Sequence, residues 1–314
     1  MQSSTLSATT VLRIGTRGSP LALAQARQVR ERLAAAHGLP IDRIELAVIR
    51  TTGDMVRDRP LAELGGKRLF TKEIEEALLA RTIDLAVHSA KDMPTVLPPG
   101  LAITAVLPRE DARDVFISRK AKTLPDLPQG AVVGTASLRR QALVKRLRPD
   151  LAVVSFRGNV ETRLRKIDAG EVDATLLALA GLKRLGLAEA ATAVLSLDEF
   201  LPAVGQGIIA IEARADDSST RALLDAVNHA DTATVLAAER AFLAVLDGSC
   251  RTPIAGHATV DAGRLHFRGL IAKPDGSEVF ETRREGAKAD AVALGADAGR
   301  ELRERGGADF FAQV

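Results

Sequence analysis

Short apolar stretches alternate with amphipathic ones along most of the chain. Val11–Ile14 is apolar and ends in the polar residues 15–20, after which Leu21–Ala36 has helical spacing and many strong helix formers. An apolar strand, a polar turn and an amphipathic helix in this order are typical of parallel α/β sheets. The pattern recurs and predicts strands at Ile44–Ile49, Ile83–Val87, Val115–Ile117, Ala131–Val133, Leu151–Ser155, Ala174–Leu179 and Ile208–Glu212, and helices at Leu138–Leu147 and Val160–Ala169.

The pattern changes after about residue 228. A helix is predicted at Thr234–Leu246, three strand-like stretches follow, and a helix at Ala289–Arg305 ends the chain. We therefore expect two α/β domains, of residues 10–107 with 203–226 and of residues 108–202, and a small antiparallel α+β domain of residues 227–314. The segment from Leu201 is assigned to the first domain because the sheet of that domain otherwise lacks an edge strand. The three strands of the last domain are expected at Ala255–Val260, Leu265–Ile271 and Glu278–Arg283.

Residues 51–70 break the alternation of strands and helices. They are charged and contain three glycines and a proline, which predicts a mobile lid. Thr71 is predicted to cap the helix that follows, whose first turn holds Glu73 and Glu75.

The amino-acid composition and charge of the chain argue against some classes of function. The chain has 314 residues, a net charge of +3, one cysteine, nine phenylalanines and no tryptophan or tyrosine. Few aromatic residues and no contiguous basic face disfavour nucleic-acid binding. No signal peptide is evident at the amino terminus and no stretch reaches the roughly 20 apolar residues of a membrane helix. We therefore expect a soluble cytoplasmic protein, with no nucleic-acid or membrane partner.

Cys250 is the only cysteine, so it cannot form an internal disulfide. Packing, metal binding, catalysis and covalent attachment of a group remain open. Its loop, Asp247–Pro253, is polar, and the adjacent Arg251 favours the thiolate, so a chemical role is slightly favoured over packing. Metal binding is disfavoured because His257 is the nearest possible second ligand.

Several strand-to-helix turns carry a cation or a hydroxyl group. Ligands bind at the carboxyl ends of strands in open α/β sheets, and helix amino termini there favour anions. The turns therefore predict a polyanionic ligand, and for Arg139 and Arg140 ligand binding is favoured over a solvated or salt-bridged position. For Asp92, turn capping and proton transfer are equally supported. The candidate ligand-binding residues are Arg17, Ser19, Lys91, Ser137, Arg139, Arg140, Arg157 and Arg163.

Eight ordered segments together resemble the hydroxymethylbilane synthase family, also called porphobilinogen deaminase. Ser249 stands where many members carry a second glycine, and Gly18 occupies a variable position. The segments are Arg13–Ala22, Gly65–Glu73, Ala86–Pro94, Gly134–Gln141, Arg157–Val160, Ala180–Gly186, Leu201–Gly207 and Gly248–Cys250.

The resemblance implies two α/β domains like those of periplasmic binding proteins, with the active cleft between them, and a third domain with the cysteine loop. It implies a monomeric transferase of porphyrin and heme biosynthesis that joins four porphobilinogen molecules head to tail, with loss of ammonia, into hydroxymethylbilane. It also implies a dipyrromethane cofactor held covalently by Cys250, and no metal.

The resemblance also assigns roles to individual residues. Asp92 is the implied catalytic residue, and Lys67 and Phe70 are implied on the lid, near the substrate. The implied ligands of the pyrrole carboxylates are Arg17, Ser19, Lys91, Ser137, Arg139, Arg140, Arg157, Arg163 and Arg184. The competing hypothesis is a two-lobed module that binds a small anion without turnover, which explains the arginines but gives no role to Cys250 or Asp92.

Overall fold

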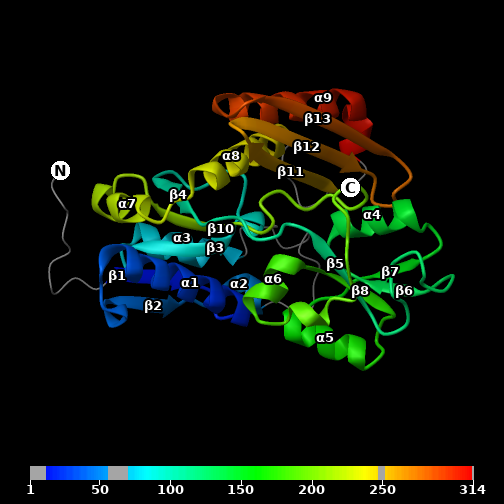
Figure 1. The fold of residues 1–314 in the computed structure, drawn as a ribbon, viewed down its shortest axis with the longest axis horizontal. Coiled ribbons are helices and arrows are strands. Elements are labelled where there is room, and N and C mark those ends of the chain that lie inside the picture. Colours follow the sequence, from blue (N-terminus) through cyan, green and yellow to red (C-terminus); the bar gives the residue numbers. More distant parts are fainter. Residues whose placement is uncertain (1–11, 56–69, 247–251, 313–314) are drawn as a thin grey trace. The chain divides into compact units, whose positions relative to one another are not determined.

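The computed structural model of the chain describes residues 12–55, 70–246 and 252–312. The chain divides into two compact units (Figure 1). The first takes its described residues from 1–56, 67–109 and 208–233, and the second takes them from 110–207 and 234–314. Each unit contains a five-stranded sheet, and the second also contains a three-stranded antiparallel sheet. The predicted α/β class with an additional antiparallel sheet is therefore confirmed, while the three domain boundaries stay a prediction.

The sheet of the first unit has the strand order β2-β1-β3-β10-β4. Strand β1 pairs in parallel with β2 and β3, whereas β10 runs antiparallel to β3 and β4. The segment predicted to add an edge strand is thus an inner strand, because the edge is formed by β4, which the apolar pattern did not reveal. The strands are β1 (Leu12–Thr16), β2 (Ile44–Val48), β3 (Leu85–Ser89), β4 (Leu101–Val106) and β10 (Ile209–Arg214).

Helices cover both faces of this sheet because successive strand residues point to opposite sides. Leu85 and Val87 pack in one apolar cluster with residues of α1 and α7, and Ala86 packs in another with residues of α3. Both faces of β3 are therefore buried, and its carboxyl end is held in place from both sides. The helices of this unit are α1 (Pro20–His37), α2 (Thr52–Met55), α3 (Lys72–Leu79) and α7 (Ser218–Asp225).

The sheet of the second unit repeats this plan, with the order β7-β6-β8-β5-β9. Strand β6 is parallel to β7 and β8, and β5 is antiparallel to β8 and β9. The described elements are β5 (Asp114–Ser118), β6 (Val132–Gly134), α4 (Leu138–Leu147), β7 (Ala152–Val154), α5 (Val160–Asp168), β8 (Ala174–Ala178), α6 (Leu179–Arg184) and β9 (Ala193–Val194).

The antiparallel sheet shares an apolar core with one face of the five-stranded sheet of its unit. Phe116 of β5 packs in one cluster with Leu143 of α4 and with Leu270 of the antiparallel sheet. The opposite face of β5 packs in a cluster that contains residues of α5 and α6. The remaining elements are α8 (Ala230–Val245), β11 (Ile254–Asp261), β12 (Arg264–Ala272), β13 (Val279–Ala287) and α9 (Ala291–Ala312).

The helix caps follow the sequence in most places. Ser19 accepts a hydrogen bond from the backbone N–H of Ala22, and Ser137 accepts one from Arg140, so these residues cap α1 and α4. The predicted cap of α3 is wrong in one respect. Thr71 occupies the N-cap position with φ −120° and ψ −24°, and its buried hydroxyl group makes no capping bond. This ψ is far from the extended value at which an N-cap oxygen reaches the first turn.

Among the described residues, we find no helix that combines the length and the apolar character needed to cross a membrane.

Candidate active site

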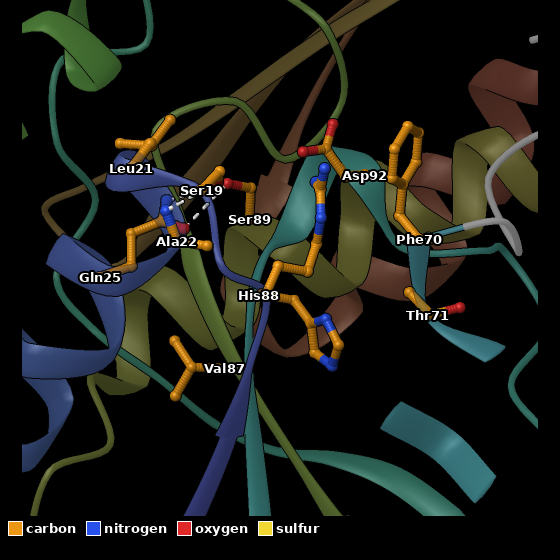
Figure 2. A pocket seen from close by; sticks show the side chains of 11 residues that line it. Ser19, Leu21, Ala22, Gln25, Phe70, Thr71, Val87, His88, Ser89 and Asp92 are labelled. Carbon is orange, nitrogen blue, oxygen red and sulfur yellow. Dashed lines mark hydrogen bonds between the residues drawn. The ribbon is translucent and has the colours of Figure 1, made fainter. Parts of the chain in front are cut away.

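A pocket lies in the first unit where β1 and β3 end (Figure 2). The chain turns from β1 through Arg17 into α1, whose start is set by the Ser19 cap and by Pro20 in the first turn. It leaves β3 through a short 3-10 turn, Ala90–Asp92. Both turns therefore bring polar side chains to the same edge of the sheet. The pocket is lined by Arg17, Ser19, Leu21, Ala22, Gln25, Phe70, Thr71, Val87, His88, Ser89 and Asp92.

Asp92 is half-buried, and its carboxylate lines this pocket with no other acid among the described lining residues. Of the residues predicted for the site, Arg17, Ser19 and Phe70 line the pocket with it. Lys91 is half-buried in the same 3-10 turn but does not belong to the lining set.

Arg17 and Phe70 form the cationic and aromatic part of the pocket. The guanidinium carbon of Arg17 lies 4.2 Å from the centroid of the Phe70 ring, within the range of a cation–π contact. A flat apolar ring and a cation next to a carboxylate suit a ligand that combines an aromatic ring with negatively charged substituents. The rest of the predicted lid, including Lys67, lies outside the described residues.

Sequence reasoning missed the polar network in the wall of the pocket. The Gln25 side-chain amide donates to the Ser89 hydroxyl at 2.8 Å (Figure 2), and Gln25 is only 2% exposed. The sequence held a signal for it, because Gln25 falls among apolar positions on the buried face of α1. His88, interpreted as a buried core histidine, is 6% exposed and lies 3.1 Å from a carboxylate oxygen of Glu212 on β10.

A second group of charges lies in the second unit, around Asp114 at the start of β5. Asp114 has no exposed surface, and Arg139 and Arg140, in the first turn of α4, are each 6% exposed. The Nη2 atom of each arginine lies 2.7 Å from a different oxygen of this carboxylate. The two arginines lie at the amino terminus of a helix, as predicted. Their side chains, however, are buried in the second unit.

Main-chain carbonyl groups complete this arrangement. The Nη1 atom of Arg139 donates to the carbonyl of Leu201, and that of Arg140 donates to the carbonyl of Leu176, both at 2.8 Å. The Gln206 amide donates to Asp114 at 2.9 Å. We call Asp114, Arg139, Arg140 and Gln206 the buried arginine cluster.

The electrostatics of the cluster follow from burial and close contact. Burial alone would raise the pKa of Asp114, but the two guanidinium groups and their hydrogen bonds hold it far below its usual range. Burial lowers the pKa of Arg139, and Asp114 opposes that change. With both arginines and the aspartate charged, the cluster carries one net positive charge.

The other predicted cations of the second unit are distributed over its turns. Arg163 of α5 donates from Nε to the carbonyl of Gly158 at 2.9 Å, and Arg157 is half-buried. Arg184, at the end of α6, donates to the carbonyl of Gly207 at 2.7 Å. Burial lowers the pKa of Arg184 to about 10, so it stays charged at neutral pH.

Comparison with known proteins places these features in a family. A family model described as the dipyromethane cofactor binding domain of porphobilinogen deaminase matches residues 12–222, and a model of the C-terminal domain of the same enzyme matches residues 233–304. The chain belongs to the porphobilinogen deaminase family. It is therefore an enzyme, a transferase, and most of its length is the part that binds the dipyrromethane cofactor in this family.

The curated relatives agree with this assignment. The porphobilinogen deaminase of Nitrobacter winogradskyi is 66% identical over 298 residues, which cover 95% of this chain and 94% of the relative. The porphobilinogen deaminase of Paracoccus denitrificans is 58% identical over 300 residues, which cover 96% of each. A periplasmic substrate-binding protein of an ABC transporter from Coxiella burnetii is among the similar solved structures. It is 15% identical, has a TM-score of 0.43, and the match covers 73% of this chain and 96% of that protein.

The described residues of this member of the family fit a group rich in carboxylates. The Nε atoms of Arg139 and Arg140 are buried and have no hydrogen-bond partner. Two such donors beside a net positive charge favour an anion. No cluster of three or more potential metal ligands occurs among the residues that the structure describes. Cys250, the predicted attachment point of the cofactor, lies outside them.

Proposed function

We propose that this chain polymerises porphobilinogen, with Asp92 as its catalytic residue and the arginines of the second unit as carboxylate ligands. Four porphobilinogen molecules are joined head to tail with loss of four ammonias, and one water adds when the chain is released, which gives the linear tetrapyrrole hydroxymethylbilane. In each addition the aminomethyl carbon of the substrate loses ammonia and leaves a cation conjugated with the pyrrole nitrogen. A pyrrole α-carbon then forms the new C–C bond and releases its proton. The alternative, an anion-binding module without turnover, is not favoured, because both family models describe the enzyme.

The pocket of the first unit supports the chemical role of Asp92. A carboxylate that accepts a pyrrole N–H stabilises the positive charge that develops when ammonia leaves, and it can take up the α-proton afterwards. Phe70 offers a flat surface for the pyrrole ring, and Arg17, held against that ring, binds an acidic substituent. The position of the carboxylate beside these two groups is the observation that carries this assignment.

The second unit supports the binding role. Each pyrrole bears two carboxylates, and arginine is the residue best suited to hold them in a fixed orientation. We assign carboxylate binding to Arg139, Arg140, Arg157, Arg163 and Arg184, with Lys91, Ser19 and Ser137 as further donors. Lys67 is assigned to the substrate from the sequence alone.

Cys250 is the proposed attachment point of the dipyrromethane cofactor. A thiolate forms a stable thioether with the electrophile that arises when an aminomethylpyrrole loses ammonia. When bound, the cofactor supplies the pyrrole α-carbon to which the first substrate ring is joined. The chain contributes the arginine side chains that hold the carboxylates of its two rings.

Intact mass under denaturing conditions tests this function. The enzyme should carry the added mass of two porphobilinogens less two ammonias, and Cys250→Ala should have the mass of the bare chain and make no tetrapyrrole. A bare wild-type chain that does not consume porphobilinogen would contradict the proposal. A Cys250→Ala chain that still carried the pyrrole mass would contradict only the attachment point.

We also infer a cytoplasmic monomer. One cysteine is consistent with a reducing compartment, and the monomeric state is what the resemblance to the family implies. Light scattering coupled to gel filtration should give the mass of one chain, close to 33.3 kDa.

A further inference from the structure

The buried arginine cluster contains a residue to which the proposed reaction gives no role. Asp114 begins β5, and both of its oxygens point to groups from other elements: α4 supplies the two guanidinium groups, and the segment before β10 supplies the Gln206 amide. Gln206 also donates to the carbonyl of Ala112 at 2.7 Å, so its amide is held independently of the arginines. Asp114 is therefore the common centre of three donors from two segments, α4 and the segment before β10, that are far apart in the sequence.

Each guanidinium group is fixed at two points. Asp114 holds the Nη2 atoms, and the main-chain carbonyls of Leu201 and Leu176 hold the Nη1 atoms. A planar fork held at both ends cannot rotate without breaking a charge-assisted hydrogen bond. Arg139 also lies with its guanidinium carbon 5.8 Å from the centroid of the Phe200 ring. The orientation of the pair is thus set before any ligand binds.

The stability of the fold alone does not explain this arrangement. Buried ion pairs often contribute no more than apolar side chains of the same size, because desolvation offsets the attraction. Here two positive charges meet one negative charge, and two buried Nε donors have no partner. Both features lower stability. The excess positive charge and the two Nε donors instead favour the binding of a carboxylate, because a carboxylate neutralises the remaining charge.

We propose that Asp114 is a positioning residue for substrate and cofactor carboxylates: it holds Arg139 and Arg140 in one fixed orientation and cancels one of their two charges. This inference rests on the proposed function of the arginine pair. Asp114 itself touches no reacting atom. Loss of its charge leaves two buried guanidinium groups that repel each other, so at least one of them must leave its orientation.

The test compares two aspartates that each bind a buried arginine, Asp114 without exposed surface and the half-buried Asp217. Asp114→Asn removes the charge at the centre of the cluster and keeps the shape of the side chain. Asp217→Asn is the matched control, because Asp217 pairs with the buried Arg214 at 2.6 Å in the first unit and does not line the pocket. Gln206→Leu is a milder variant that removes one hydrogen bond from Asp114 without changing the charge.

Each variant is purified, its folded fraction is isolated by gel filtration, and its pyrrole mass and steady-state kinetics are measured. Loss of a positioned ionic contact with substrate raises KM and leaves kcat nearly unchanged. For chains that carry the pyrrole mass, we expect Asp114→Asn to raise KM at least about tenfold. A tenfold rise corresponds to the loss of about 1.4 kcal/mol of binding free energy. Gln206→Leu should raise KM by a smaller factor, and Asp217→Asn should leave KM unchanged even where it lowers the melting temperature.

An unchanged KM in Asp114→Asn with full pyrrole mass overturns the inference. An equal rise of KM in Asp217→Asn also overturns it, because the effect would then follow from weakened folding. If Asp114→Asn does not fold, Gln206→Leu decides: a raised KM at unchanged kcat supports the positioning role, and a wild-type KM overturns it. All of these outcomes require turnover by the wild type, so they are distinct from a failure of the proposed function.

Discussion

The pocket of the first unit and the buried arginine cluster of the second lie at equivalent places in two sheets of the same plan, yet their charges differ in burial. Asp92 and Arg17 are half-buried at the edge of their sheet, whereas Asp114, Arg139 and Arg140 have almost no exposed surface. The carboxylate of Asp92 has to be accessible to each incoming substrate. Asp114 only has to hold other side chains in one orientation, so it can be buried, and burial strengthens its contacts. The same edge of the sheet thus carries accessible charges in one unit and buried charges in the other.

The largest expected effect concerns Asp92. Asp92→Asn keeps the shape of the side chain and removes the charge that stabilises the cationic intermediate, so kcat should fall by about 10²-fold or more. The melting temperature should change little, because the carboxylate is half-buried. Stopped-flow measurement of ammonia release, together with calorimetry, checks both parts. Near-normal turnover would assign Asp92 to turn capping.

The second prediction concerns stability. Here we expect the larger loss in the buried arginine cluster and the smaller loss at the pocket of the first unit. Arg140→Met leaves Asp114 paired with Arg139 but removes the charge-assisted hydrogen bond from Arg140, so the free energy of unfolding should fall by about 1.5–3 kcal/mol. Arg17→Met removes a partly exposed cation–π contact and should lower it by about 1 kcal/mol or less. Urea denaturation of both variants measures the difference. Equal losses would show that burial does not separate the two regions.

The third prediction compares the contributions of two arginines of the second unit to elongation. A well-desolvated charge-assisted contact contributes about 1.5–3 kcal/mol, so Arg184→Leu, at a partly buried site, should impair elongation more than Arg163→Leu. Because the ligand grows while its binding residues do not move with it, each variant should accumulate chains of a characteristic length. Mass spectrometry after brief exposure to limiting porphobilinogen displays these lengths. An unchanged distribution with a lower overall rate would instead indicate a diffuse electrostatic effect.

The smallest expected effect is a pH dependence at the acidic end. The folded state holds the pKa of Asp114 below its value of about 3.9 in the unfolded chain, so its ionised form contributes stability that is complete above that value. This contribution is lost as the pH falls through the lower pKa of the folded state. The difference in unfolding free energy between the wild type and Asp114→Asn should be constant from about pH 8 to 5 and shrink below about pH 4. A difference that grew on acidification would contradict the assigned charge state.

Local sequence patterns predicted an element well where the interactions that form it lie within one segment of the chain. The helix predicted at Leu138–Leu147 has these bounds in the structure, because its apolar spacing and its Ser137 cap are contained in the segment. Thr71 shows the limit of such reasoning: a capping residue type at the correct position makes no capping bond, because the backbone entering α3 has a different conformation. Strand β4 was not predicted, although Leu101–Val106 is a mostly apolar stretch of 6 residues.

The sequence by itself determined the family, the alternation of strands and helices, and the positions of Asp92 shortly after a strand and of Arg139 at a strand-to-helix turn, since each of these depends on residues that are neighbours in the chain. Only the tertiary structure decided which charges are buried and what they contact. Arg139 and Arg140 were predicted as ligand-binding cations, but nothing near them in the sequence indicates that Asp114 on β5 lies between them. That partnership exists because β5, α4 and the segment before β10 pack around one point, and burial at that point makes an opposite charge necessary.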